Sequence, residues 1–465
     1  MKEMRIQSYA FKKLIGLLSI MFLLIVIIYS ISIDFNIVSE NSYSKRMEIN
    51  IKNRFTTSNQ PKLLTYRQFD KLKKYPMDSV SITNEIDSFL ETERSGYPVK
   101  VVLSGEELDN FINIHMVKGA FLNSDQNRLG SKVAVISETL VQKLFLTDYV
   151  LGNEIYILGM KYKIVGIFKD DSSIFSLLSS DGVERVYIPF ESMPNYTQLA
   201  INTVYVKDSR LQQNPFSIES LDDILKKLNV NIDLYKVSGY SKSSVFISQP
   251  FSVFILFIGI LIILSILRYF LKFIKLVFCH FNALLKDRYF LEMLAVSKLK
   301  ILFIVFVSAL FPLSIGIIYN TIKFNGFIPY EFIPGDNVFD FGFYLIIIKQ
   351  AINNANNFAG YIPTKLELLF KVYILTTYIL FLFLVIIFVF INNAIKLQKS
   401  LSDTNSKSLL ALAVSIVSGV TAGSLLCMIC GVTIDIPVKQ LVIVIIYFCN
   451  KAIKADQTKF IDSCL

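Results

Sequence analysis

Tryptophan is absent from this 465-residue chain, and histidine occurs only twice, as His115 and His280. Five cysteines are present, but none lies between residues 34 and 242, so no disulfide can stabilise that stretch. Cys427 and Cys430 have the CxxC spacing, yet they lie in an apolar run without the context of a redox or zinc motif. The topology predicted below places the histidines on opposite sides of a membrane, which excludes a two-histidine metal site within one chain.

Motifs of the common catalytic classes are also missing. No GxxxxGK[S/T] phosphate-binding loop occurs, so the chain cannot hydrolyse ATP by that route. Serine is plentiful, but no GxSxG nucleophile elbow is found. We therefore expect no catalytic residue, no metal site and no cofactor in this chain, and we do not expect it to be an enzyme by itself.

Hydrophobic residues, by contrast, make up 53% of the chain and include 39 Phe, too many for an ordinary soluble protein. Uncharged runs long enough to cross ~30 Å of hydrocarbon occur at 14–33, 243–267, 301–322 and 372–395. We expect the first to be an uncleaved anchor. It is longer than the apolar core of a signal peptide, and bulky Ile31 and Ile33 occupy the place where a cleavage site needs small residues.

Two further apolar runs, 408–434 and 438–450, follow these four core spans. They predict one or two additional helices in a C-terminal extension, residues 396–465, forming a hairpin. Gly419 and Gly423 are four residues apart on one face of the first run. That spacing suits close helix packing, although glycine is also tolerated in membrane helices without such a role.

The charge distribution predicts the topology. Residues 34–242 carry 25 basic and 26 acidic residues, so the net charge of +10 comes from the segments that flank the apolar runs. Basic residues cluster at 2–13, 268–300 and 396–407. Because Lys and Arg favour the cytoplasmic side, we expect a multi-pass plasma-membrane protein with a cytoplasmic N-terminus and an extracytoplasmic domain at 34–242. No basic stripe with interleaved aromatics occurs in that domain, which argues against a nucleic-acid partner.

The polar stretch 34–242 alternates strand and helix patterns. The segment 130–193 predicts a buried strand at 133–136, a helix capped by Ser137, a hairpin turning at 158–160 and one more strand. Val133, Val135, Ile164 and Val165 are expected in its core. Elsewhere we expect helices at 63–75 and 220–228 and strands at 203–206 and 230–237. The two groups of elements predict an α+β domain of two lobes rather than one sheet.

Four stretches in this order carry a family resemblance: VVLSGEELDNFINIHMVKGAFLNSDQN, VAVISETLVQKLF, LGNEIYILGMKYKIVGIF and VYIPFESM. Together they resemble the extracytoplasmic core domain of MacB/FtsX-type ABC transporter permeases, over roughly residues 62–237. The resemblance implies an FtsX-like membrane domain at 243–395, following the first helix (1–33) and the core domain. It also implies a partner ATPase subunit that holds ATP and Mg²⁺.

The family also places a helix that docks on the ATPase in the cytoplasmic loop 268–300. Here LLKDRYFLEMLAVSKLKIL stands at that place. Lys286-Asp287 match the family's basic–acidic pair, and Glu292 and Ala295 replace its lysine and glycine. The implied coupling residues are Leu284, Lys286, Asp287, Arg288, Leu291, Glu292, Leu294 and Ala295. A merely interfacial helix with solvated charges remains the alternative.

The resemblance thus implies a permease subunit that couples ATP hydrolysis by a separate ATPase to movements of its extracytoplasmic domain. Its task would be export or removal of a peptide, bacteriocin, drug or lipid-like substrate. We expect a homodimer or pseudo-symmetric dimer, a lipid bilayer around it and an extracytoplasmic adaptor. Two alternatives stay open: an FtsX-like regulator of an extracellular cell-wall hydrolase, and a membrane-anchored sensor or binding protein.

Overall fold

The computed structural model describes residues 2–42, 46–52, 63–73, 77–92, 95–112, 114–145, 149–170, 173–207, 226, 230, 234–240, 243–287, 298–322, 324, 340–357, 361, 363–401 and 405–462. The chain divides into two compact units. The helical unit comprises Met1–Ile33, Val245–Phe327 and Thr376–Leu465. The sheet domain comprises Asp34–Ser244 and Ile328–Leu375.

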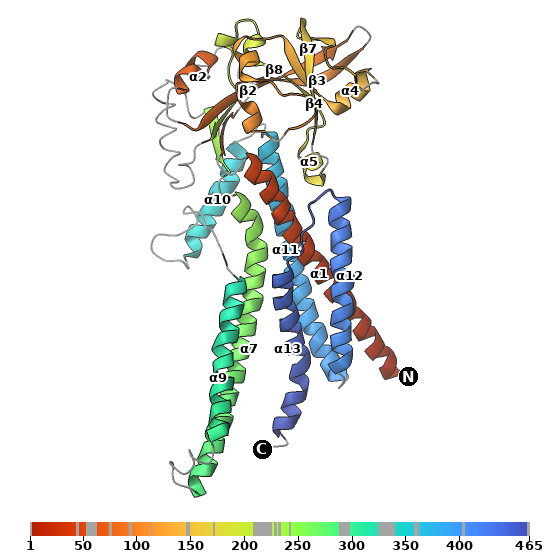
Figure 1. Cartoon of the computed structure of the whole chain (residues 1–465), viewed down its shortest axis with the longest axis vertical. Helices are drawn as coiled ribbons and strands as arrows, with labels where there is room; N and C mark the ends of the chain where they lie inside the picture. The colour runs from red at the N-terminus through yellow and green to blue at the C-terminus, as the bar shows by residue number, and fades with distance from the viewer. Residues whose placement is uncertain are drawn as a thin grey trace. The chain divides into compact units, whose positions relative to one another are not determined.

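Long helices account for the apolar runs (Figure 1). They are α1 (Lys2–Ser42), α7 (Ser243–Asp287), α9 (Lys298–Ile322), α11 (Lys365–Leu401), α12 (Asn405–Ile429) and α13 (Val438–Asp462), and a shorter helix, α10, spans Phe341–Asn357. In the described part of the chain, five segments are long and apolar enough to cross a membrane: Phe11–Val38, Ser243–Ala283, Lys298–Ile322, Lys365–Ile395 and Leu410–Ile429. This result confirms a transmembrane bundle, and the fifth segment lies in the predicted C-terminal extension.

Helix α7 differs from the prediction in length. The sequence predicts that the second span ends at residue 267 and that a loop follows, but the helix continues through the basic stretch to Asp287. Leu, Phe and Lys are the commonest residues in 268–287, which contain neither Gly nor Pro, and nothing in that composition ends a helix. The loop expected at 268–300 is therefore shorter at its N-terminal side.

Gly419 and Gly423 bring α12 into close contact with α1 inside the helical unit. A Cβ atom added at Gly419 would lie 2.5 Å from the backbone oxygen of Ser19 and 2.7 Å from the Cβ of Phe22. At Gly423 the nearest atoms, including the Cβ of Val26, would be 3.1 Å away. Of the two readings of these glycines, the structure supports close helix packing.

Gly419→Ala should therefore destabilise the helical unit. The added methyl would collide with backbone, an overpacking defect that typically costs about 1–3 kcal/mol. Gly316→Ala in α9 is the matched control, since a Cβ there meets nothing within 4 Å and alanine has the better helix propensity. Thermal unfolding of both variants in detergent measures the difference. Equal midpoints would show that the α1–α12 contact is absent.

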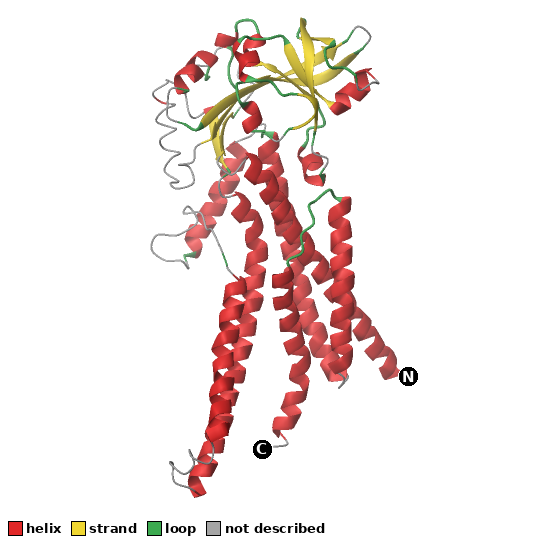
Figure 2. Cartoon of the chain, viewed as in Figure 1, coloured by secondary structure: helices red, strands yellow, loops and turns green. Residues whose placement is uncertain are grey.

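The described residues of the sheet domain form ten strands. They are β1 (Arg46–Ile51), β2 (Ser79–Glu91), β3 (Gly96–Ser104), β4 (His115–Gly119), β5 (Val133–Ser137), β6 (Glu154–Ile157), β7 (Met160–Lys169), β8 (Glu184–Pro189), β9 (Thr203–Lys207) and β10 (Tyr235–Gly239). Their order is β10-β1-β9-β2-β3-β8-β5-β7-β4, with β6 pairing with β2 and β7. Strands β3 and β8 are parallel, as are β5 and β7. Figure 2 shows this sheet in yellow.

Short helices complete the domain. They are α2 (Tyr66–Leu72), α3 (Ser124–Arg128), α4 (Glu138–Phe145) and α5 (Ile174–Ser179), with 3₁₀ turns at Leu108–Asn110, Phe190–Ser192 and Tyr196–Gln198. The predicted order over 130–193 is confirmed: β5, α4, the β6–β7 hairpin and β8. The Leu140 amide donates to the Ser137 hydroxyl at 3.2 Å, as expected of a cap. Leu158 and Gly159, both with positive φ, form the hairpin turn.

Other expectations need correction. The described strands form one continuous sheet rather than the separate sheets of two lobes, because the long strand β2 pairs with β3, β6 and β9. The helix predicted at 63–75 is α2, which begins at Tyr66 and not at residue 63, because Thr65 and Gln68 form a capping box there. The last strand begins at Tyr235, opposite Ile51. The helix predicted at 220–228 falls almost wholly outside the described residues.

The sheet is buried on both faces at β5. Ala134 and Ile136 belong to one apolar cluster and Val135 to another, and all three are fully buried. Ile164 is also in the core, while Val133 and Val165 are partly buried at its margin. This arrangement confirms a β-branched strand covered on both sides. The predicted strand at 203–206 is confirmed as β9.

Candidate functional site

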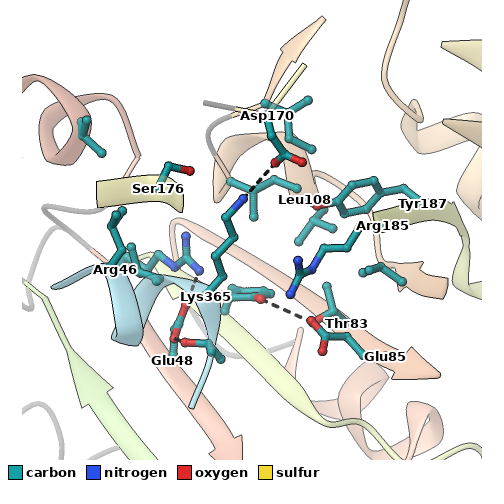
Figure 3. Close-up of a pocket in the computed structure, with 18 residues that line it drawn as sticks. Arg46, Glu48, Thr83, Glu85, Leu108, Asp170, Ser176, Arg185, Tyr187 and Lys365 are labelled. Carbon is teal, nitrogen blue, oxygen red and sulfur yellow. Dashed lines mark hydrogen bonds and ion pairs between the residues drawn. The ribbon is translucent and has the colours of Figure 1, made fainter. Parts of the chain in front are cut away.

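A buried ion pair lies on one face of β1. Arg46 and Glu48 are two residues apart and so project from the same side of the strand. They are 3% and 0% exposed, and their side chains contact each other directly. The Arg46 guanidinium also donates to the backbone oxygen of Phe111 and lies 4.3 Å from the ring centre of Tyr205. The charged pair is therefore enclosed by hydrogen bonds and an aromatic face. Figure 3 shows Arg46 and Glu48 side by side.

The Glu48 carboxylate links this pair to the start of α11. It accepts hydrogen bonds from the Thr364 hydroxyl at 2.7 Å and from the Tyr240 hydroxyl at 3.1 Å. The Thr364 hydroxyl in turn accepts the amide of Glu367 at 3.2 Å, which is the bond of a helix N-cap. One threonine thus caps α11 and ties it to β1.

Glu367, in the first turn of α11, forms a second link to the sheet. Its carboxylate forms ion pairs with Nζ of Lys236 on β10 at 2.6 Å and with Nζ of Lys371 at 2.8 Å. It also accepts a hydrogen bond from the Tyr361 hydroxyl at 2.5 Å. The Glu367 side chain is 6% exposed. Because a helix N-terminus favours negative charge, this carboxylate is stabilised by the helix as well as by both lysines.

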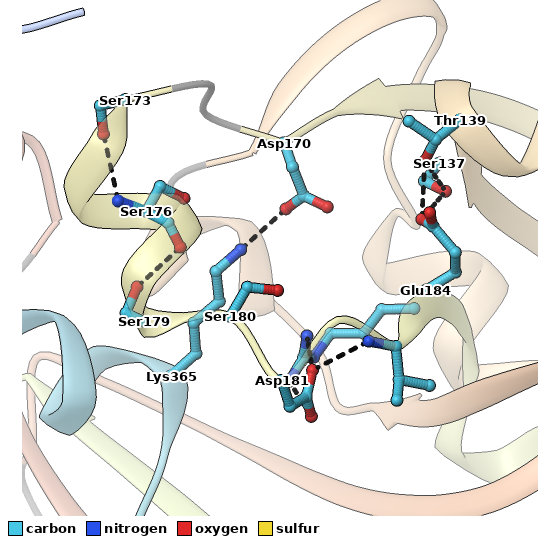
Figure 4. A network of polar contacts seen from close by, with 12 residues as sticks. Ser137, Thr139, Asp170, Ser173, Ser176, Ser179, Ser180, Asp181, Glu184 and Lys365 are labelled. Carbon is cyan, nitrogen blue, oxygen red and sulfur yellow. Dashed lines mark hydrogen bonds and ion pairs between the residues drawn. The ribbon is translucent and has the colours of Figure 1, made fainter. Parts of the chain in front are cut away.

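Two further contacts extend the junction. Lys365 Nζ lies 2.9 Å from Asp170, which follows β7 (Figure 4). The Tyr373 hydroxyl donates to Asp34 of α1 at 2.6 Å, and both residues are buried. We refer to Arg46, Glu48, Tyr240, Thr364, Lys365 and Glu367 as the α11 junction. Every member belongs to the sheet domain.

A cavity of about 110 Å³ lies beside the junction, lined by Arg46, Glu48, Lys365, Asp170, Arg185 and Tyr187 among others. Arg185 forms two 3.2 Å contacts with Asp181. Burial disfavours the Asp181 carboxylate, but Lys100 and Arg185 outweigh burial and hold its pKa below its ordinary value. Positively and negatively charged side chains thus lie together in and beside the cavity wall.

Burial and the nearby Glu48 raise the pKa of Tyr240 and of Tyr205 well above that of free tyrosine. Both phenols therefore stay protonated. The Tyr240 hydroxyl donates to Glu48, and the Tyr205 hydroxyl accepts a hydrogen bond from the Thr83 hydroxyl at 3.4 Å. No group of three or more His, Cys, Asp or Glu side chains that could hold a metal ion occurs in the described part of the chain. The arrangement joins the start of one helix to strands β1 and β10 through Glu48 and Lys236.

The predicted coupling residues do not lie in this junction. Leu284, Lys286 and Asp287 are in the last turn of α7. Arg288, Leu291, Glu292, Leu294 and Ala295 lie outside the described residues, so the docking helix remains a prediction. His115 is exposed on β4.

Sequence reasoning missed the junction, although one local signal was available. Thr364-Lys-Leu-Glu367 has the S/T-x-x-E pattern that marks a helix start. Glu367 and Lys371 also have the i, i+4 spacing of a helical ion pair. Neither pattern identifies Glu48, which lies 316 residues away in the chain.

Glu48→Gln should destabilise the sheet domain by about 3–5 kcal/mol, because it leaves the buried Arg46 without its counter-charge. Tyr240→Phe removes only one donor to the same carboxylate and should cost about 1 kcal/mol. Urea unfolding of the full chain in detergent compares the two variants. Similar losses of unfolding free energy in the two variants would contradict a dominant contribution of the Arg46–Glu48 ion pair.

Asp181 should make the sheet domain sensitive to acid. Its pKa is lowered in the folded state, so its stabilisation is present above the unfolded value of about 4 and is lost as pH falls through the folded value. Asp181→Asn should therefore be less stable than the native chain at pH 7, and the gap should close below about pH 4. Glu154→Gln, which breaks an exposed pair with Lys161, should change little at either pH. A gap that persisted in acid would rule out the charge effect.

Comparison with known proteins gives a family match over the first part of the chain. Residues 14–215 match the family model described as the MacB-like periplasmic core domain. No curated protein matches the chain.

Two crystal structures are similar to part of the chain. One is the periplasmic region of MacB from Actinobacillus actinomycetemcomitans, at 16% identity and a TM-score of 0.36, covering 43% of this chain and 91% of that one. The other is the extracellular domain of the noncanonic ABC-type transporter YknZ from Gram-positive bacteria. It has 13% identity and a TM-score of 0.33 and covers 42% of this chain and 100% of that one. The family match over residues 14–215 supports the resemblance to the MacB-like periplasmic core domain that was found in the sequence.

Proposed function

We propose that this chain is the membrane subunit of an ABC transporter whose ATP hydrolysis takes place on a separate ATPase subunit. The observation that carries the proposal is the match of residues 14–215 to a MacB-like core domain, together with the five helices of membrane-spanning length in the described part of the chain. The absence of a phosphate-binding loop from the sequence agrees with a separate ATPase. Two ATPase subunits need two docking loops, so the chain works as a pair.

In this proposal α11 carries motion to the sheet domain. The helix is continuous from Lys365 to Leu401, and its residues up to Leu375 belong to the sheet domain. The α11 junction binds its first turn to β1 through Glu48 and to β10 through Lys236. Separating these buried charges is costly, so a displacement of α11 moves the strands with it. Such rigid transmission suits movement of an extracytoplasmic domain that handles a peptide, drug or lipid-like substrate.

The proposed orientation places the N-terminus and residues 268–300 in the cytoplasm. Seven basic residues lie in 268–300 against two acidic ones, which is the bias that keeps a loop inside. In this orientation the sheet domain is extracytoplasmic, and the end of α7 faces a cytoplasmic ATPase.

Leu291→Asp tests the coupling. If residues 284–295 form a helix docked in a groove of the ATPase, the new carboxylate would be buried there without a partner. The variant should insert and fold but lose the copurifying ATPase or its stimulation by 10-fold or more, roughly the effect of a loss above 1.4 kcal/mol.

Lys286→Ala, at the rim of the same helix, is the matched control and should change the stimulation much less. Full stimulation with Leu291→Asp would overturn the docking assignment. Failure of any ATPase to copurify with the native chain would favour an anchored sensor or binding protein.

A further inference from the structure

Helix α5 has an unusual distribution of side chains. Its apolar residues Ile174, Leu177 and Leu178 are 39%, 66% and 64% exposed, whereas its serines Ser176 and Ser179 are buried. The helix is nevertheless well formed. The Ser176 amide donates to the Ser173 hydroxyl at 3.3 Å, and the Ser179 hydroxyl donates to the Ser176 oxygen at 3.0 Å (Figure 4). Three adjacent apolar side chains therefore face outward from an ordered helix, which needs an explanation.

The remaining apolar residue of α5 fixes its position on α11. The ring of Phe175 stacks on that of Tyr373 with 4.0 Å between centroids. Tyr373 is the second residue of the uncharged run 372–395, directly after Lys371. At 1.5 Å per residue this run is about 36 Å long, enough for the hydrocarbon core, so its first residues lie at the membrane–water boundary.

The residues that directly follow the uncharged run 14–33 also contact Tyr373. Asp34 is the first charged residue after the uncharged run 14–33, and its carboxylate accepts the Tyr373 hydroxyl at 2.6 Å. The ring of Phe35 lies 5.1 Å from that of Tyr373. Two spans that are more than 300 residues apart in the chain thus end at one level. Tyrosine is also a residue that favours this interfacial layer.

The geometry points to α5 as a lipid contact of the sheet domain: Ile174, Leu177 and Leu178 insert into the interfacial layer of the bilayer at the level of Tyr373. Two described carboxylates near α5 agree with this. Asp170 is paired with Lys365, and Asp181 with Lys100 and Arg185, so these two carboxylates do not oppose insertion. A lipid partner is favoured over a protein because contact with Tyr373 sets the depth of the helix at a membrane boundary.

This contact would give the sheet domain a second attachment to the membrane besides its connecting helices. It joins the β7–β8 connection to the lipid, next to the cavity wall that contains Asp170 and Ser176. The inference uses only the membrane character of the chain and its two span boundaries. It does not depend on the ATPase partner, so a failed ATPase experiment would leave it standing.

The absence of tryptophan makes a direct test available. Leu178→Trp in the full chain, reconstituted in phosphatidylcholine vesicles, would contain the only indole. Its emission should be blue-shifted, resist quenching by acrylamide in the water and be quenched by lipids brominated on the acyl chain near the head group. Leu129→Trp is the control, since Leu129 is 80% exposed elsewhere in the sheet domain. Its emission should be that of an indole in water, quenched by acrylamide and not by brominated lipid.

Two results would overturn the inference. An indole at 178 that behaves like the one at 129 would show that α5 faces water. A blue-shifted indole that brominated lipid does not quench would show that α5 is covered by protein, such as a second copy of the chain. Ile174→Trp repeats the measurement at an independent position if Leu178→Trp does not fold.

Discussion

The buried carboxylate of Glu48 is the interaction on which the arrangement of the sheet domain depends. It neutralises Arg46 and accepts hydrogen bonds from Tyr240 and Thr364. Removing a charge from water costs several kcal/mol unless it is paired and hydrogen-bonded, so these partners must be held together. β1, the end of β10 and the first turn of α11 consequently form one polar cluster at the edge of the sheet.

The same logic explains why α11 begins where it does. Pro363 precedes the cap, Thr364 supplies the capping oxygen and Glu367 provides negative charge in the first turn. These are ordinary local signals, but here each capping group also has a partner on the sheet. A helix start that needs the sheet to satisfy its polar groups cannot move independently of it.

The helical unit is held together by different forces. Its described core is almost wholly apolar, and close approach depends on small residues where α12 meets α1. Lipid is as apolar as leucine, so packing at Gly419 and Gly423 stabilises the unit where the hydrophobic effect between helices is weak. The sheet domain, in contrast, combines apolar cores on both faces of β5 with buried charge at its edge. Helix α5 departs from both patterns, because Ile174, Leu177 and Leu178 remain exposed in the described part of the chain.

Hydropathy and charge in the sequence alone determined the membrane class and the places of the spans. The order of elements over residues 130–193 also followed from the sequence, because β-branched runs, a capping serine and a two-residue turn act over a few residues. The single sheet did not follow, since the pairing of β2 with β3, β6 and β9 depends on residues distant in the chain. Nor did the α11 junction: Thr364 and Glu367 mark a helix start locally. Only the folded chain brings Glu48 and Lys236 next to them. A buried charge needs a counter-charge or hydrogen bonds, and these partners can come from any part of the chain.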